Sequence, residues 1–184
     1  MDFMQLPVQF DVKPIQEYCE ANPQLFDLNP GRRVAKNSPH AQMTDMWIRY
    51  APDKVGATEH ESIWYDEYKE VPLVKQICDV LMVAVNGVKL GGVLITKLPP
   101  GKQILPHRDS SWHSQEYDKF YIPITRPEDS SYNFKSGAIL GSPGDTFWFD
   151  NFWTHWVLNN SKQDRLSMIV CIKTDAFTSL KERV

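Results

Sequence analysis

From about residue 87 onward, the sequence is a series of short apolar segments separated by turn-forming residues. Two of these turns are Pro99-Pro100-Gly101 and Ser142-Pro143-Gly144-Asp145. Short β-branched and aromatic runs with Gly, Pro, Asn and Asp between them are typical of an antiparallel sandwich or barrel. We therefore expect strands at Gly92–Leu98, Ile104–His107, Phe120–Thr125, Gly137–Ser142, Thr146–Phe149, Trp156–Asn159 and Leu166–Thr174.

Ahead of this β region, the sequence favours one helix and an irregular cap. Apolar residues at helical spacing predict an amphipathic helix over Pro72–Asn86. Prolines punctuate the first third, which predicts irregular chain holding a short helix after Pro14 and a strand at Met46–Tyr50. We expect a single domain over residues 1–184, divided into an N-terminal cap (1–70), a supporting helix (71–86), a β core (87–175) and a tail (176–184).

The composition is that of an ordinary globular domain, with 42% hydrophobic and 23% charged residues, which excludes a disordered tail. The formal net charge of −3 disfavours a dedicated nucleic-acid binder, because phosphate neutralisation needs a basic face. Cys19, Cys78 and Cys171 lie far apart, so we expect reduced thiols. No signal peptide or membrane span is visible, so we expect no membrane contact and a cytoplasmic protein of a bacterium or a virus-infected cell.

A His-x-Asp triplet and a later histidine are the strongest indication of chemistry. His107 and Asp109 follow an expected strand, and residues two apart in extended chain point to the same face. His155 directly precedes another strand, and a sheet that folds back brings it alongside. Two imidazoles and one carboxylate leave coordination positions open, which suits Fe(II) that activates O2; zinc in a hydrolase is the nearest alternative. A chance triplet and a packed histidine are the non-functional interpretation.

Arg165 opens the otherwise apolar strand Leu166–Thr174. A cation at such a position can point into a barrel and hold a buried carboxylate through paired hydrogen bonds. A solvated turn position beside Asp164 is the alternative interpretation.

These residues, in this order and with these flanking turns, resemble a known enzyme family. The stretch from about Gly87 to Asp175 is similar to the aspartyl/asparaginyl β-hydroxylase-like branch of the 2-oxoglutarate- and Fe(II)-dependent oxygenases. The resemblance implies a mainly β fold, a double-stranded β-helix (cupin-like jelly roll) with flanking helices. It rests on Leu98-Pro-Pro-Gly101, Ile104-Leu-Pro-His-Arg-Asp109, Phe120-Tyr-Ile-Pro-Ile-Thr125, Trp148-Phe-Asp-Asn151, His155-Trp-Val-Leu-Asn159 and Asp164-Arg165.

The resemblance also implies the roles of individual residues. His107, Asp109 and His155 would be the iron ligands and catalytic centre, and Arg165 would bind the distal carboxylate of the cosubstrate 2-oxoglutarate. The family usually carries an arginine and a histidine where this chain has Lys119 and Tyr121, which would reach the C1 carboxylate instead. The implied reaction consumes O2 and 2-oxoglutarate, releases succinate and CO2, and leaves a hydroxyl on a C–H carbon.

Six further residues are candidates for substrate contact. Ser110, Ser111, Trp112 and His113 follow the triplet on an expected loop at the pocket mouth, and Trp47 and Arg49 are candidates for a pocket wall. A solvated loop and simple core packing of Trp47 are the alternatives.

Other polar residues receive weaker assignments. Asp150-Asn151 and Asn159 lie near His155 in the sequence and are candidates to orient its second ring nitrogen, with turn chemistry as the alternative. His40 and His60 are expected to be exposed and without a role.

The sequence therefore predicts an Fe(II)/2-oxoglutarate-dependent oxygenase. Its expected substrate is an amino-acid residue in a peptide or protein, or a related small molecule. Two alternatives remain open: a cupin-type metal-binding protein without 2-oxoglutarate chemistry, and a non-catalytic binding or structural barrel. The acidic balance disfavours oxidative demethylation of nucleic acid by the same chemistry.

Overall fold

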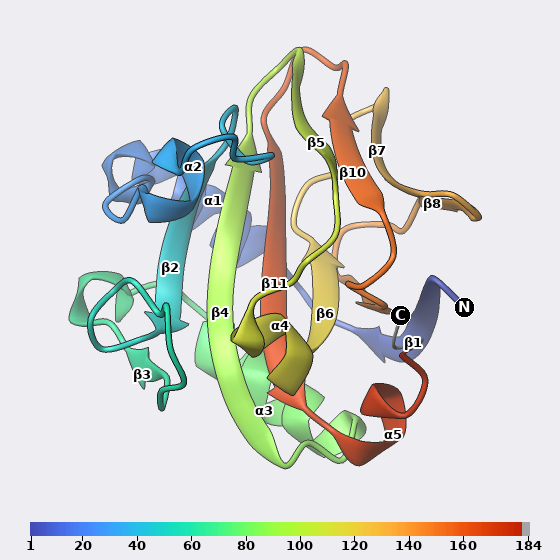
Figure 1. Cartoon of the computed structure of the whole chain (residues 1–184). Helices are drawn as coiled ribbons and strands as arrows, with labels where there is room; N and C mark the ends of the chain where they lie inside the picture. The colour runs from blue at the N-terminus through green and yellow to red at the C-terminus, as the bar shows by residue number, and fades with distance from the viewer. Residues whose placement is uncertain (182–184) are drawn as a thin grey trace.

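The computed structural model describes residues 1–181, which form two antiparallel sheets with helices beside them (Figure 1). The larger sheet contains, in spatial order, β1 (Phe3–Gln9), β9 (Asp145–Phe149), β6 (Asp118–Pro123), β11 (Arg165–Lys173), β4 (Lys89–Leu98), β2 (Thr44–Tyr50) and β3 (Ile63–Trp64). The smaller sheet contains β5 (Lys102–His107), β10 (His155–Asn159), β7 (Ser130–Phe134) and β8 (Gly137–Ile139).

From β4 to β11 the chain passes back and forth between the two sheets. It runs from β4 to β5, on to β6, then to the β7–β8 hairpin, and returns through β9, β10 and β11. Every strand pair in both sheets is antiparallel. This alternation is the winding of a jelly roll, and the predicted fold class is confirmed.

The larger sheet is covered on its outer face by α3 (Val74–Ala84). Leu81 of α3, Ile95 of β4 and Met168 of β11 are fully buried and belong to one apolar cluster. The predicted helix over Pro72–Asn86 therefore exists but begins two residues later, because Leu73 has a left-handed backbone (φ 62°) that cannot continue a helix. Packing of this helix leaves the inner face of the larger sheet free for a cavity.

The N-terminal cap is more regular than its prolines suggested. Phe3–Gln9 forms β1, which pairs with β9 at the edge of the larger sheet, where Pro7 is tolerated because an edge strand has one unpaired side. The short helix expected after Pro14 is present as α1 (Lys13–Ala21). The remaining short helices are η1 (Pro23–Leu25), α2 (Gly31–Val34), η2 (Asp66–Tyr68), α4 (Trp112–Glu116) and α5 (Asp175–Thr178).

The predicted strands are present with shifted ends, and three strands were missed: β1 and β3 in the cap, and β7 in the β core. Ser130–Phe134 forms β7, in which Tyr132 and Phe134 are buried and the alternate residues Ser131 and Asn133 are half-buried. Cys19, Cys78 and Cys171 are free and buried. Among the described residues, no helix is long and apolar enough to cross a membrane. Residues 182–184 of the expected tail lie outside the described residues.

Candidate metal centre and active-site cavity

A cavity of about 460 Å³ lies between the two sheets. Strand alternation builds it, because successive residues of a strand face opposite sides of a sheet. On β11, Arg165, Ser167, Ile169 and Cys171 line the cavity, whereas the intervening residues pack into the core beneath α3. Every second residue of β11 therefore forms part of the cavity wall.

His107, Asp109 and His155 meet at one side of this cavity. His107 ends β5 and His155 begins β10, and the two are directly paired across these strands with ring centroids 4.3 Å apart. Asp109 Oδ1 lies 3.7 Å from His107 Nε2, and Asp109 Oδ2 lies 4.0 Å from His155 Nε2. One ligand atom from each residue falls within 4.8 Å of the others, so a single metal ion can bind all three.

Backbone carbonyls orient both imidazoles for metal binding. His107 Nδ1 lies 2.8 Å from the Leu105 carbonyl oxygen, and His155 Nδ1 lies 2.9 Å from the Trp153 carbonyl oxygen. A carbonyl oxygen only accepts, so each Nδ1 carries the proton and each Nε2 keeps its lone pair for a metal.

The side chains expected to orient His155 are occupied elsewhere. Asn151 donates to the Ser114 carbonyl, Asn159 donates to the carbonyls of Leu98 and Gln163, and Asp150 accepts from the Phe152 amide. The carbonyl of Trp153 takes the role that the sequence had suggested for them, because it lies two residues before the histidine on the same turn.

The charges of the cluster also suit a divalent cation. Burial lowers the pKa of His155 to about 4 and also lowers that of His107, so both rings are neutral near pH 7. Burial raises the pKa of Asp109, but the Lys119 ammonium, joined by the two histidines once they are protonated at low pH, outweighs burial and holds that pKa well below its usual range. Two neutral imidazoles and one ionised carboxylate, with positions left open, are the donor set of non-haem Fe(II) sites.

Arg165 reaches the same cavity as a buried cation. The residue is only 5% exposed, and its Nη2 donates to the Tyr121 hydroxyl at 2.7 Å. Within residues 1–181, no carboxylate forms an ion pair with it. A buried guanidinium without an anionic partner is costly, so this position favours binding of an anion from outside the chain.

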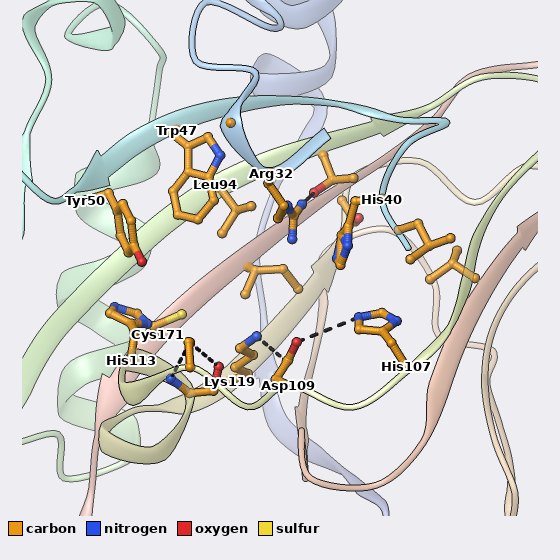
Figure 2. Close-up of a pocket in the computed structure, with 18 of the residues that line it drawn as sticks. Arg32, His40, Trp47, Tyr50, Leu94, His107, Asp109, His113, Lys119 and Cys171 are labelled. Atoms are coloured by element: carbon orange, nitrogen blue, oxygen red, sulfur yellow. Dashed lines mark hydrogen bonds and ion pairs between the residues drawn. The ribbon is translucent and has the colours of Figure 1, made fainter. Parts of the chain in front are cut away.

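The two residues expected at the C1 carboxylate of 2-oxoglutarate lie in different places. Lys119 lines the cavity and forms an ion pair with Asp109 (Figure 2). Tyr121 is buried beside Arg165 and does not line the cavity. Both residues are on the same face of β6, but they pair with different positions along β11. Lys119 pairs with Cys171, whereas Tyr121 pairs with Ile169, two residues closer to Arg165.

Three of the six residues expected to contact substrate line the cavity: Trp47, Ser111 and His113. Ser111 also caps α4 by accepting from the Ser114 amide. Ser110 does not line the cavity. Arg49 does not line it, because its guanidinium donates to the carbonyls of Leu90 and Gly91 at 2.8 and 2.7 Å. Trp112 does not line it either; its indole donates to the Gly56 carbonyl.

The sequence missed or misjudged two cavity residues, His40 and Arg32, and expected a loop where a third, His113, lies on a helix. His40 is 8% exposed rather than solvated, and its ring lies edge-on to that of His107 at 4.6 Å. His113 lies on α4, where a loop was expected, and is 5% exposed. Arg32, from α2, binds Asp45 through two hydrogen bonds of 3.0 and 2.8 Å at the cavity edge. Nothing in the local sequence marks His40 or Arg32 as cavity residues, because long-range packing of the cap places them.

Comparison with protein families identifies the chain. The model of the aspartyl/asparaginyl beta-hydroxylase family matches residues 28–174, most of the sequence. The protein belongs to the aspartyl/asparaginyl β-hydroxylase family. The predicted resemblance is confirmed, and it extends into the cap beyond the segment on which it was based. A search of curated proteins found none that matches this family member.

Solved structures share the fold of this aspartyl/asparaginyl β-hydroxylase family member at low identity. A 2OG-Fe(II) oxygenase family oxidoreductase from Burkholderia pseudomallei is 12% identical, with a TM-score of 0.60 over 94% of this chain and 84% of that one. A prolyl-4-hydroxylase from Pseudomonas putida is 14% identical, with a TM-score of 0.59 over 94% and 92%. A viral collagen prolyl hydroxylase from Paramecium bursaria Chlorella virus-1 is 11% identical, with a TM-score of 0.56 over 95% and 97%.

Proposed function

We propose that this protein is an Fe(II)- and 2-oxoglutarate-dependent oxygenase that hydroxylates an amino-acid residue in a peptide or protein, or a related small molecule. The observation that carries the proposal is the buried Arg165 guanidinium, which has no carboxylate partner and shares one cavity with the His107, Asp109 and His155 cluster. A dicarboxylate that binds a metal at one end and an arginine at the other fits this pairing. Bound Fe(II) would supply the O2 activation that couples 2-oxoglutarate decarboxylation to C–H hydroxylation.

Fe(II) would be held by His107 Nε2, His155 Nε2 and one oxygen of Asp109. The Leu105 and Trp153 carbonyls keep both imidazoles in the tautomer that a metal needs. Lys119 binds Asp109 and neutralises part of its charge, so its role in this proposal is to position the carboxylate.

The distal carboxylate of 2-oxoglutarate would bind Arg165, and Tyr121, which does not line the cavity, would hold the guanidinium in place. The Tyr121 hydroxyl accepts a hydrogen bond from Arg165, which leaves its own proton free to donate. Burial raises the pKa of Tyr121, so the hydroxyl stays protonated near pH 7. The other N–H groups of the Arg165 guanidinium can then bind the carboxylate through paired hydrogen bonds.

Apolar side chains close the cavity around these polar groups. Tyr132, Phe149 and Val157 come from three strands and are each 5% exposed or less. Such walls exclude bulk water, which strengthens the electrostatic interactions inside and protects reactive species.

The substrate class follows from the family and not from a contact in the cavity. Among proteins with a similar fold is a prolyl hydroxylase from Trichoplax adhaerens whose structure contains a peptide fragment of hypoxia inducible factor. A cavity of about 460 Å³ that must also hold the cosubstrate has room for a side chain or a small molecule.

The test is an aerobic assay with Fe(II), 2-oxoglutarate and candidate peptides or amino acids, following succinate. Arg165→Met should raise the KM for 2-oxoglutarate by roughly 10- to 100-fold, the usual loss for a hydrogen bond to a charged group. Arg126→Met is the matched control, because Arg126 is exposed and lies outside the cavity. Succinate formation that Arg165→Met leaves unchanged would point instead to a metalloprotein without 2-oxoglutarate chemistry.

Metal binding is measured separately, so that the non-catalytic alternative is also tested. Anaerobic titration should give one Fe(II) per chain in the wild-type protein and none after His107→Ala. If the protein binds no Fe(II) at micromolar concentrations, or if His107→Ala binds it equally well, the cavity is a binding module rather than an oxygenase site.

A further inference from the structure

The cavity continues past the metal cluster into an arm that the proposed cosubstrate does not occupy. Arg165 and Cys171 both line the cavity from β11, and at about 3.3 Å per residue they lie roughly 20 Å apart along the strand. His113 and Cys171 lie on the opposite side of Lys119 and Asp109 from His107 (Figure 2). The cosubstrate would extend from Arg165 to the metal, so this far arm is available to another molecule.

A β-bulge shapes the far arm. Val170 pairs with Val93 and Ile172 with Leu90, so Cys171 faces the two glycines between them on β4, Gly91 and Gly92. A bulge disrupts the local ladder and redirects side chains, and bulges are common beside active sites.

The two glycines leave room for aromatic rings. A Cβ on Gly91 would lie 2.7 Å from the Tyr117 ring, and a Cβ on Gly92 would lie 3.1 Å from Tyr50 and 3.3 Å from His113. The glycine pair is therefore required for these rings to lie against the backbone of β4.

The bulge also fixes the tautomer of His113. The backbone N–H of Gly92 donates to His113 Nε2 at 3.2 Å. A nitrogen that accepts carries no proton, so the proton of the neutral ring is on Nδ1. Within residues 1–181, Nδ1 has no hydrogen-bond partner, and His113 is one of the residues that line the cavity.

Neighbouring rings hold His113 in this orientation. Its ring stacks on Tyr117 at 4.5 Å and meets Tyr50 edge-on at 5.2 Å. Tyr50 in turn contacts Trp47 at 4.4 Å, and both line the cavity. The far arm thus presents a rigid N–H donor beside a continuous aromatic surface.

The charges of the cavity exclude a cationic ligand from this arm. Asp109 is the only carboxylate among the described residues that line the cavity, and Lys119 already binds it. Arg32 and Lys54 add positive charge at the cavity edge. A neutral donor surrounded by cations and aromatic rings suits a carbonyl-type oxygen attached to a flat or apolar group.

We propose that the arm formed by Trp47, Tyr50, His113 and Cys171 is the subsite for the molecule to be hydroxylated, and that His113 Nδ1–H donates to a carbonyl oxygen of that molecule. This inference rests on the proposed oxygenase function. It assigns His113 to substrate binding and leaves the metal and 2-oxoglutarate to other residues.

The first test observes His113 directly and does not depend on turnover. Protein with 15N-labelled histidine is prepared with Zn(II) and 2-oxoglutarate, and N-acetyl amino-acid amides covering all side-chain types are added singly at about 10 mM, above usual KM values. The free protein should show the Nδ1–H tautomer of His113, and at least one amide should shift its Nδ1–H resonance. An Nε2–H tautomer, or a resonance that no amide shifts, overturns the proposal.

The second test separates substrate binding from a structural role. His113→Phe keeps the ring but loses both nitrogens, whereas His113→Gln can still accept from Gly92 and donate into the cavity. For the best amide, His113→Phe should raise KM roughly 3- to 10-fold, the loss expected for a neutral hydrogen bond, and leave kcat and the KM for 2-oxoglutarate unchanged. His113→Gln should restore most of the loss.

His60→Phe is the matched control, because His60 stacks on His113 at 6.1 Å but does not line the cavity. An equal rise in KM for His60→Phe, or a fall in kcat or in Fe(II) binding for His113→Phe, would assign His113 a structural role and overturn the proposal. A wild-type protein that shifts the His113 resonance but forms no succinate would refute the oxygenase function and leave the binding site standing.

Discussion

Replacing Lys119 by methionine should destabilise the metal-free protein and make its stability depend more strongly on metal. Lys119 and Asp109 form an ion pair in which the side chains are 17% and 14% exposed. Methionine fills similar space without the charge and leaves an ionised carboxylate facing two neutral imidazoles. Removing one partner of a buried pair is costly because the remaining charge is left without compensation.

The magnitude follows from the burial. Breaking a fully buried ion pair costs about 3–5 kcal/mol, and the residual exposure of both side chains reduces this to about 2–3 kcal/mol. For a chain of 184 residues, that loss corresponds to a fall in Tm of roughly 4–12 °C.

The assay is urea unfolding near pH 7 in the presence of a chelator. Lys54→Met is the matched control, because the Lys54–Glu67 pair is 49% and 42% exposed and its loss should cost no more than about 1 kcal/mol. In the background of Asp109→Asn, Lys119→Met should no longer destabilise the protein and should instead stabilise it, because Asp109→Asn leaves the Lys119 ammonium without its partner.

Metal should reverse the defect. Mn(II) would supply the positive charge that Lys119 provided, so the Lys119→Met protein should gain more stability from Mn(II) than the wild type does. The reasoning is refuted if Lys119→Met is as stable as the wild type without metal, or if its defect is the same in the Asp109→Asn background.

Three further outcomes follow from burial and backbone geometry. Burial lowers the pKa of His155 to about 4 and that of His113 to about 3, so below pH 6.5 the unfolded chain takes up protons that the folded protein does not. The free energy of unfolding should therefore fall as the pH drops from about 6.5 towards 4, and urea titrations across this range measure it. Mn(II) affinity should persist to a lower pH than an ordinary histidine site allows, which isothermal titration calorimetry at several pH values would check; a midpoint near pH 6.5 would contradict the burial argument. Gly144→Ala should cost about 3–4 kcal/mol, since a Cβ there would lie 2.0 Å from the Phe10 carbonyl oxygen. Gly101→Ala, also at a left-handed φ but with open space around it, should cost about 1 kcal/mol in the same assay.

The sequence alone predicted most strands of the β core and the residue types of the cluster. Alternating apolar residues with regular turns predicted the strands, because this pattern directly reflects which side of a strand is buried. The His107-x-Asp109 spacing placed two ligand types on one face for the same reason. Arg165 was recognisable because a cation that opens an apolar strand is unusual.

Only the tertiary structure decided how these parts meet. The pairing of His107 with His155 depends on the register of β5 and β10, which no local pattern encodes. The burial of His40 and His113 depends on how the cap and α4 fold over the cavity. The periodicity of apolar residues shows which face of a strand is buried. The register of the strands and the positions of the loops are set by the packing of the whole molecule, so they are known only when distant segments are brought together.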